Sequence, residues 1–364
     1  MKKIHILSPG FTSPNAIAFL FPLFFNLERL KNIGIFFCLF NSINPKIHDC
    51  DLLIIDSRFY SKKWTHSNDE KIFDELIKLK EKIGHLVFFD ISDSTGWVQS
   101  QVLPFVDYYY KSQLHSDLNA YKKSIYGNRF HADYYYKTAG VEDDQSVWSS
   151  PVINDSHLKK MKISWNSGLA NYSLSGPTLM SFRRLIPINS LLRYPKNFTK
   201  TDTQRNLDIS CRMGISYPRK TVCHQRIAIK NILMKYLPTD KLSRTKYFQE
   251  LINSKIVISP FGYGEITLKD FEVFITGGLL LKPDMSSINT YPNFFVNEVT
   301  MASHSWDLLD LEEKIDHILS NPTTYQDVAK EGQDIYKHYV ASEEGYQEFC
   351  NYFQSITKEC LGFN

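Results

Sequence analysis

The sequence predicts an α/β protein of two domains, each built on a parallel sheet, with a helical C-terminal tail. Its 364 residues exceed the roughly 100–200 residues of one ordinary domain. Short apolar runs alternate with helical stretches up to residue 90 and again after residue 206. Such alternation, with strands that are apolar throughout, is typical of parallel sheets covered by helices on both faces.

The N-terminal domain is expected over residues 1–195. Strands are predicted at 3–7, 35–40, 52–56 and 85–89, and helices at 15–30 and 69–82. Asp56 and Asp90 directly follow two of these strands. Open α/β sheets bind their ligands at the carboxyl ends of the strands, so both carboxylates are candidates for a site there.

The C-terminal domain is expected over residues 205–345, followed by a helix over 346–364 that packs back on the N-terminal domain. Strands are predicted at 207–211, 256–259 and 279–282, and helices at 221–236, 246–253, 266–275, 311–319, 325–339 and 346–357. The stretch 194–206 is polar, contains Pro195 and lacks apolar periodicity. It is therefore the predicted linker.

Composition and charge exclude several classes of function. The 42 Lys and Arg residues against 39 Asp and Glu residues give a net charge of +3, too low to indicate nucleic-acid binding. Six scattered cysteines and eleven histidines show no metal-ligand spacing, so neither a metal nor another cofactor is expected. The apolar run 16–25 is about half the length that spans a bilayer. The chain is expected in the cytoplasm, with peripheral membrane contact at most.

One run of sequence carries most of the functional information: SPFGYGEITLKDFEVFITGG, residues 259–278. It follows a predicted strand and opens a helix. Gly262 and Gly264 let the backbone approach a ligand, and the helix N-terminus after them presents unpaired N–H groups and a partial positive charge. These features predict a pyrophosphate site. The signal is weak by itself, because Thr267 stands where a dinucleotide fingerprint has its third glycine.

The periodicity of that helix places Glu265, Lys269 and Glu272 on one face. Lys269 is suited to neutralise a phosphate, and Glu272 to accept two ribose hydroxyl protons. Tyr263, in the preceding loop, is suited to stack on a base or a sugar. The alternatives are that Glu265 and Lys269 form an exposed i, i+4 pair and that Tyr263 is simple packing; spacing alone does not decide between them.

These residues resemble a known family. Pro260–Gly262, Lys269, Glu272, Gly277 and Leu279–Leu281 are similar to the C-terminal domain of bacterial GT-B glycosyltransferases, in particular the family-1-like group that includes the spore-maturation glycosyltransferases, with a fainter likeness to exostosins. The resemblance covers about residues 205–345. It implies two Rossmann-like domains whose parallel sheets face a cleft, a nucleotide sugar bound mainly by the C-terminal domain, and no requirement for metal.

The sequence departs from the family pattern in one respect. Six residues separate Glu265 from Glu272, whereas seven separate the two glutamates of the retaining members. Glu265 stays a candidate donor contact by position, but the family's sugar-contacting role is not carried over to it, and the stereochemistry is left open. Arg212, just after a predicted strand, resembles a donor-phosphate contact of GT-B enzymes; the alternative is an ordinary surface charge.

A catalytic base is expected on the N-terminal domain, in a loop after a strand, where a carboxylate can reach the acceptor hydroxyl. Asp93 is the first candidate and Asp90 the second, because their loop leaves a predicted buried strand. The alternative is that such a residue caps the next helix. The acceptor side is expected to be lined by Gly10, Phe11, Thr12 and Asp56.

The sequence thus predicts a metal-independent glycosyltransferase. It would move a sugar from a nucleotide sugar to a glycan or lipid-linked acceptor, and the resemblance implies a setting in bacterial surface polysaccharide or lipopolysaccharide synthesis. Arg212, Lys269 and the helix N-terminus would stabilise the departing diphosphate. Two alternatives remain open: a GT-B-fold sugar-nucleotide epimerase, and a non-catalytic subunit that binds a nucleotide sugar.

Overall fold

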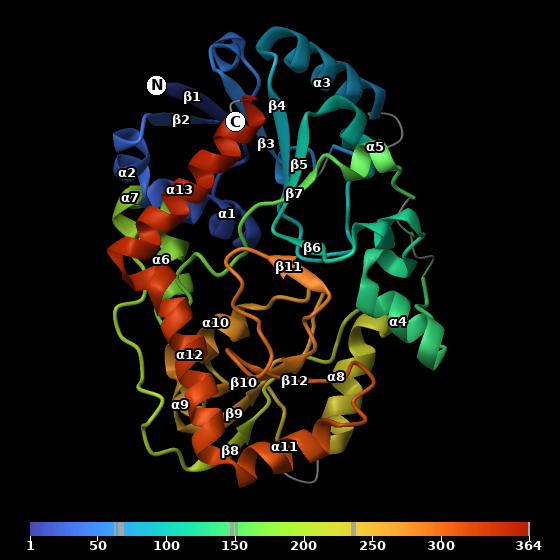
Figure 1. Cartoon of the computed structure of the whole chain (residues 1–364), viewed down its shortest axis with the longest axis vertical. Coiled ribbons are helices and arrows are strands. Elements are labelled where there is room, and N and C mark those ends of the chain that lie inside the picture. Colours follow the sequence, from blue (N-terminus) through green and yellow to red (C-terminus); the bar gives the residue numbers. More distant parts are fainter. Residues whose placement is uncertain (62, 65–68, 146–148, 150–151, 234–237, 363–364) are drawn as a thin grey trace.

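The structure, a computed structural model, describes all residues except 62, 65–68, 146–148, 150–151, 234–237 and 363–364. Two α/β halves lie one above the other in Figure 1, with the N-terminal half at the top. Each half contains a sheet in which every pairing is parallel. The predicted fold class, α/β with two Rossmann-like parallel sheets, is confirmed.

The N-terminal sheet has six strands in the order β2-β1-β3-β4-β5-β7. They are β1 (Lys2–Leu7), β2 (Ile35–Phe40), β3 (Leu52–Asp56), β4 (Leu86–Asp90), β5 (Tyr108–Lys111) and β7 (Met161–Ile163). The associated helices are α1 (Pro14–Phe25), α2 (Leu27–Asn32), α3 (Asp69–Ile83), α4 (Phe130–Ala139) and α5 (Asp155–Leu158). Strands β3 and β4 are buried along their whole length, as their unbroken apolar sequences predict.

The C-terminal sheet has four strands in the order β12-β10-β9-β8. They are β8 (Leu207–Ser210), β9 (Ser254–Ile258), β10 (Leu279–Pro283) and β12 (Ala302–His304). The helices of this half are α8 (Lys220–Leu233), α9 (Arg244–Asn253), α10 (Leu268–Thr276), α11 (Leu311–Ser320) and α12 (Pro322–Ala341). Between the two sheets the chain forms two short helices, α6 (Gly176–Ser181) and α7 (Ile188–Leu191).

Two further contacts join the halves. Strand β6 (Gln113–His115) pairs antiparallel with β11 (Ile288–Thr290), which gives a two-stranded sheet made of both halves. Helix α13 (Glu343–Cys360) leaves the C-terminal half and runs up over the N-terminal half in Figure 1. There Tyr352 donates a hydrogen bond to the carbonyl of Ile163, at 2.8 Å, and Glu359 accepts one from Tyr110, at 2.7 Å.

The apolar core reflects this arrangement. One cluster of buried residues runs continuously from α1 and the N-terminal sheet to α10, α12 and α13, while separate clusters fill the other face of each sheet. Trp165 lies in the shared cluster, stacked on Phe19 of α1 and edge-on to Phe349 and Phe353 of α13. The two halves therefore pack as one unit around a common apolar centre.

Two details differ from the sequence predictions. The helix expected over 15–30 is two helices, because the chain breaks at Asn26, whose side-chain amide donates to the carbonyl of Pro22. Strands β5, β6, β7, β11 and β12 were not predicted, since each has only three or four residues and the tyrosine-rich stretch around Tyr108 has no apolar periodicity. The last three residues of the predicted helix 221–236 lie outside the described residues. Among those described, no helix combines the length and apolar character that crossing a bilayer requires.

Candidate functional site

A cavity of about 310 Å³ lies between the two sheets. The N-terminal half contributes the start of α1, the loop after β4 and the first residue of β6. The C-terminal half contributes the loop after β9, the start of α10 and one arginine of α8. The cavity therefore stands at the carboxyl ends of strands from both sheets, where α/β folds bind ligands. Its polar lining includes Asn15, Ser92, Asp93, Gln113, Asn166, Ser167, Tyr217, Arg226, Tyr263 and Thr267.

The glycine-rich loop predicted as a phosphate cradle reaches this cavity. Gly262, Tyr263 and Gly264 line it, together with Thr267 and Leu268 at the start of α10. A side chain at Gly264 would place its Cβ 1.9 Å from the carbonyl oxygen of Asp93, so only glycine permits this approach of the two loops. The two halves touch here, which brings the start of α10 opposite the loop after β4.

Two buried arginines hold that loop from opposite sides. Arg226 of α8 donates from Nε to the carbonyl of Phe261 at 2.6 Å, and Arg129 donates from Nε to the carbonyl of Tyr263 at 2.7 Å. They are only 8% and 7% exposed. Neither forms an ion pair with a carboxylate of the described residues. Burial lowers the pKa of each guanidinium.

Burying a cation without an ion-pair partner costs free energy unless an anion binds next to it. Arg226 lines the cavity directly, and its Nη2 lies on the side of Gly262, where an added Cβ would be 3.2 Å away. The start of α10 contributes the partial positive charge of its N–H groups to the same space. The C-terminal side of the cavity is thus electropositive and suited to an anion such as a diphosphate.

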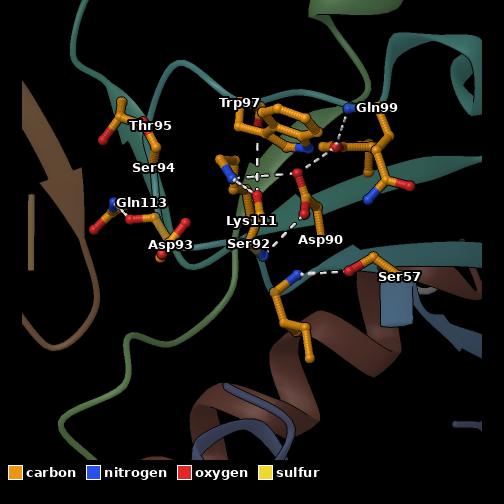
Figure 2. A network of polar contacts seen from close by, with 12 residues as sticks. Ser57, Asp90, Ser92, Asp93, Ser94, Thr95, Trp97, Gln99, Lys111 and Gln113 are labelled. Atoms are coloured by element: carbon orange, nitrogen blue, oxygen red, sulfur yellow. Dashed lines mark hydrogen bonds and ion pairs between the residues drawn. The ribbon is translucent and has the colours of Figure 1, made fainter. Parts of the chain in front are cut away.

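Asp93 lines the same cavity from the N-terminal half. Its side chain is exposed, and no hydrogen bond or ion pair of that side chain is found among the described residues; the Gln113 amide donates instead to the Asp93 backbone carbonyl, at 2.7 Å. Figure 2 shows Asp93 beside Gln113 and apart from the Asp90 network. A second cavity, of about 880 Å³, shares Ser92 and Asp93 with the first. The Asp93 carboxylate therefore stands where two cavities meet.

The second cavity belongs to the N-terminal half. It opens at the carboxyl ends of β3 and β4, and two tryptophans, Trp64 and Trp97, contribute aromatic surface. Polar groups surround them: Ser57, Arg58, Ser61, Ser100, Gln99, Gln101, Arg129, Asn154 and His157. Aromatic faces interspersed with hydroxyl, amide and guanidinium groups suit a polar organic ligand with several hydroxyls.

Asp90, the second candidate for the base, does not fit that role. It is fully buried and pairs with the equally buried Lys111 at 3.2 Å, and it accepts hydrogen bonds from the Tyr109 hydroxyl and the Ser92 amide (Figure 2). Burial alone would raise the pKa of Asp90, but the Lys111 charge and these hydrogen bonds hold it below its ordinary value. Asp90 orders the loop and lines neither cavity.

Arg212, which the sequence predicted to contact the donor phosphate, does not line the cleft. Its guanidinium makes a bidentate ion pair with Glu250, at 2.6 Å between Nη2 and Oε2, and it faces a different cavity beside β8. A phosphate in the cleft would have to compete with that carboxylate. The cation that the cleft does receive from this half is Arg226.

Lys269 and Glu272 point into the C-terminal half and do not line the cleft cavity. Lys269 is half-buried and donates to the backbone carbonyls of Arg212 and Ile258, at the ends of β8 and β9. Glu272 is 6% exposed and pairs with Arg244 at 3.0 Å. Burial lowers the pKa of Lys269 and raises that of Glu272. In this structure both residues support the site from behind.

Glu265 joins the halves. It is fully buried and accepts hydrogen bonds from the Thr95 amide at 2.9 Å and the Gln113 amide at 2.8 Å, while His131 Nδ1 lies 3.4 Å away. Burial alone would raise the pKa of Glu265, but His131 and the Thr95 amide hold it below its ordinary value. The carboxylate fixes the loop that presents Asp93, which makes Glu265 a positioning residue.

The expected acceptor-side residues lie behind the cavities. Gly10, Phe11 and Thr12 form the loop before α1, and it is the next residues, Pro14 and Asn15, that line the cleft. Asp56 is fully buried and accepts hydrogen bonds from Ser8 and the Arg58 amide. Its neighbours Ser57 and Arg58 line the second cavity.

Arg226 and Arg129 were missed as site residues. For Arg226 the sequence holds a signal: it falls at the spacing of Val222, Ile229 and Leu233, the buried face of α8. A charged residue on an apolar helix face indicates a specific partner. Arg129 follows an irregular segment and has no comparable pattern. Among the described residues, no group of three or more His, Cys, Asp or Glu side chains is arranged to hold a metal ion.

Neither a protein-family model nor a curated protein matches the sequence. Among solved structures, similar folds include Anabaena Alr3699/HepE in complex with UDP and glucose (10% identity, TM-score 0.46, covering 98% of this chain and 99% of that one). A glycosyltransferase from Rickettsia africae (12%, 0.47, 100% and 99%) and sucrose-phosphate synthase from Thermosynechococcus elongatus (13%, 0.45, 100% of each) are also similar. At such identities and TM-scores, these similarities assign neither an activity nor a ligand to this chain.

Proposed function

We propose that the protein is a metal-independent glycosyltransferase that uses a nucleotide sugar. The observation that carries the proposal is the position of Asp93 at the junction of two cavities, in one of which the buried cation Arg226 also forms part of the lining; among the described residues the Asp93 carboxylate has no partner. The cleft cavity would take the donor and the second cavity the acceptor. One transfer reaction needs both compartments, with a base between them.

In the proposed reaction the acceptor hydroxyl loses its proton to the Asp93 carboxylate as its oxygen attacks the anomeric carbon. The bond from that carbon to the diphosphate oxygen breaks, and the diphosphate leaves with the bonding electrons. Arg226 and the start of α10 stabilise the charge that develops on the leaving group. Attack from the side opposite the diphosphate inverts the anomeric centre.

Supporting roles follow from the contacts. Gly262 and Gly264 let the backbone approach the diphosphate, and Tyr263 lines the donor cavity as a stacking surface. Lys269 fixes the ends of β8 and β9, and Glu272, through its ion pair with Arg244, joins α10 to α9 behind the donor cavity. The proposed acceptor is a glycan or lipid-linked glycan, and the proposed setting is bacterial surface polysaccharide synthesis at the inner face of the membrane. The resemblance of residues 260–281 supports that setting.

The test has two steps. A thermal-shift screen of UDP-, GDP-, CMP- and dTDP-sugars identifies the donor, because a ligand that binds only the folded state raises the melting temperature. The wild type should then release nucleoside diphosphate from that donor slowly without an acceptor. Return of an altered sugar without release would indicate an epimerase, and binding without either reaction would indicate a non-catalytic subunit.

The variant Asp93→Asn separates binding from chemistry. It removes the base while keeping the shape of the side chain, so turnover should fall by about 10²–10⁴-fold, and donor affinity should change little. Asp74→Asn, on the exposed face of α3 and outside the lining of both cavities, is the matched control and should keep its turnover. Full activity of the Asp93 variant would overturn the assignment of the base.

A further inference from the structure

Three large apolar side chains are exposed together between α6 and α7. Phe182, Leu185 and Ile186 are 45%, 81% and 40% exposed. The amides of Leu185 and Ile186 both donate to the Phe182 carbonyl, at 2.8 and 3.1 Å, so one tight turn sets the three side chains on the same side. Arg183 and Arg184 lie within this turn. We call these five residues the apolar–basic patch.

The helices on either side of the patch are packed against the core of the protein. It lies between α6 and α7, whose inner residues Met180 and Leu191 belong to the shared core. Gly176, at the start of α6, is in such close contact that an added Cβ would be 2.3 Å from the carbonyl oxygen of Asn171. The inner face of the segment is therefore fixed by packing, and the exposure of the outer face is a property of the fold.

The charges of the sequence segment that contains the patch are of one sign. No Asp or Glu occurs from residue 156 to residue 201, whereas the same stretch holds eight lysines and arginines, so the rest of the chain is net negative. The eight are Lys159, Lys160, Lys162, Arg183, Arg184, Arg193, Lys196 and Lys200. Arg183 and Arg184 take part in no ion pair with a described residue; Arg183 donates to the Met180 carbonyl. Their charge is available to an external partner.

We propose that the apolar–basic patch docks the protein on an anionic lipid surface. Phe182, Leu185 and Ile186 would enter the boundary between headgroups and acyl chains, and Arg183 and Arg184 would pair with lipid phosphates. A bilayer with anionic lipids is apolar inside and negative at its surface, which complements an apolar tip with two flanking cations.

Docking there would bring to the bilayer a segment that is continuous in sequence with the lining of the cleft. Ser167 and Tyr172, just before the patch in sequence, line the cleft cavity. Arg244 of α9 donates to the carbonyls of Ser173 and Leu174, at 2.8 and 2.7 Å, and so ties the connecting segment to the C-terminal half. This position favours an acceptor carried on a lipid. That last step rests on the proposed function, but the docking itself does not.

Sedimentation with vesicles tests the docking without any substrate. The full chain is mixed with vesicles of phosphatidylcholine alone and with vesicles of equimolar phosphatidylcholine and phosphatidylglycerol. We expect binding to the second kind that weakens as salt is added, because exposed charges are screened, and little binding to the first. Equal binding to both kinds, or binding to neither, would overturn the proposal.

Paired variants locate the contact. R183Q/R184Q should lower partitioning onto the anionic vesicles by about tenfold or more, given the contribution of each cation near such a surface. F182S/L185S/I186S should lower it by a similar factor through lost apolar insertion. The controls are K71Q/K78Q and Ile77→Ser on α3, which change exposed residues of the same kinds far from the patch. Equal loss in the control variants would contradict the assignment.

The docking and the activity can fail separately. Vesicle binding by a protein that transfers no sugar would leave the docking intact and remove the proposed function. Sugar transfer to a soluble acceptor by a protein that ignores anionic vesicles would do the reverse. Circular dichroism of each variant, expected to match the wild type because all substituted side chains are exposed or half-buried, excludes unfolding as the cause.

Discussion

The two sheets each bury an aspartate–lysine pair at their carboxyl ends, but the cleft between them holds buried charges without such partners. Asp90 and Lys111 pair at 3.2 Å in the N-terminal half, and Asp270 and Lys282 pair at 3.0 Å in the C-terminal half; all four side chains are fully buried. Arg226, equally part of the interior, has no carboxylate partner among the described residues.

This comparison distinguishes buried charges that stabilise the fold by pairing with each other from a buried charge that can pair with a ligand. Each lysine neutralises a carboxylate that organises a loop: Asp90 accepts from the Ser92 amide, and Asp270 accepts from the Thr267 amide at the start of α10. Arg226 organises a loop too, through the Phe261 carbonyl, yet its charge remains available to the cavity. An anionic ligand in the cleft would neutralise Arg226, as Asp90 and Asp270 neutralise the two buried lysines.

Removing one member of a paired charge should have the largest effect on stability. Lys111→Met leaves Asp90 buried beside only neutral donors, and loss of one partner of a buried pair costs about 3–5 kcal/mol. Urea unfolding should show this loss in the midpoint. The double variant D90N/K111M removes both charges and should recover much of the stability; a double variant as unstable as the single one would show that the ion pair is not the cause.

The comparison also explains what the sequence could and could not predict. Seven of the ten strands in the two parallel sheets follow from apolar runs, and the glycine loop follows from Gly262 and Gly264; these are local features. The partners of charged residues are not local. Arg212 was expected to meet phosphate, but Glu250, 38 residues away, occupies its guanidinium. The sequence placed Asp93 before Asp90 as the candidate base but could not show that Lys111, on the neighbouring strand, pairs with Asp90.

Asp56 is the opposite case, a buried carboxylate that forms no ion pair with a cation of the described residues. Burial raises its pKa to about 6, although hydrogen bonds from Ser8 and the Arg58 amide oppose the shift. The unfolded chain ionises this group near its ordinary value of 3.8. Between these two pKa values the folded state binds the extra proton, so this group destabilises the fold as pH rises towards 6 and above.

Asp56→Asn should therefore stabilise the protein at neutral pH, by about 2–3 kcal/mol if the two hydrogen bonds survive. The advantage should shrink as pH falls from 7 to 4, because the wild-type carboxyl becomes protonated and neutral like the amide. Denaturant unfolding at several pH values measures it. A stability difference that is constant over this range would show that the Asp56 pKa is not raised.

The smallest effect on stability should come from replacing Arg226. The same variant tests whether Arg226, as the structure indicates, or Arg212, as the sequence predicted, contacts the donor. Arg226→Gln loses hydrogen bonds to the carbonyls of Phe261 and Gly214 but also an uncompensated buried charge, so its unfolding free energy should change by no more than about 1.5 kcal/mol. Its affinity for the nucleotide-sugar donor should nevertheless fall by about 1.5–3 kcal/mol, as expected for a lost charged hydrogen bond.

Arg212→Gln is the matched variant, since Arg212 lies in the same half and was the residue that the sequence favoured. It should lose stability, because Glu250 would lose its partner, and keep its donor affinity. Isothermal titration with the donor found in the screen measures both variants. If Arg212→Gln weakened the donor and Arg226→Gln did not, the Glu250 pair would have to open on binding, and the diphosphate would belong at the end of β8 and not beside Gly262.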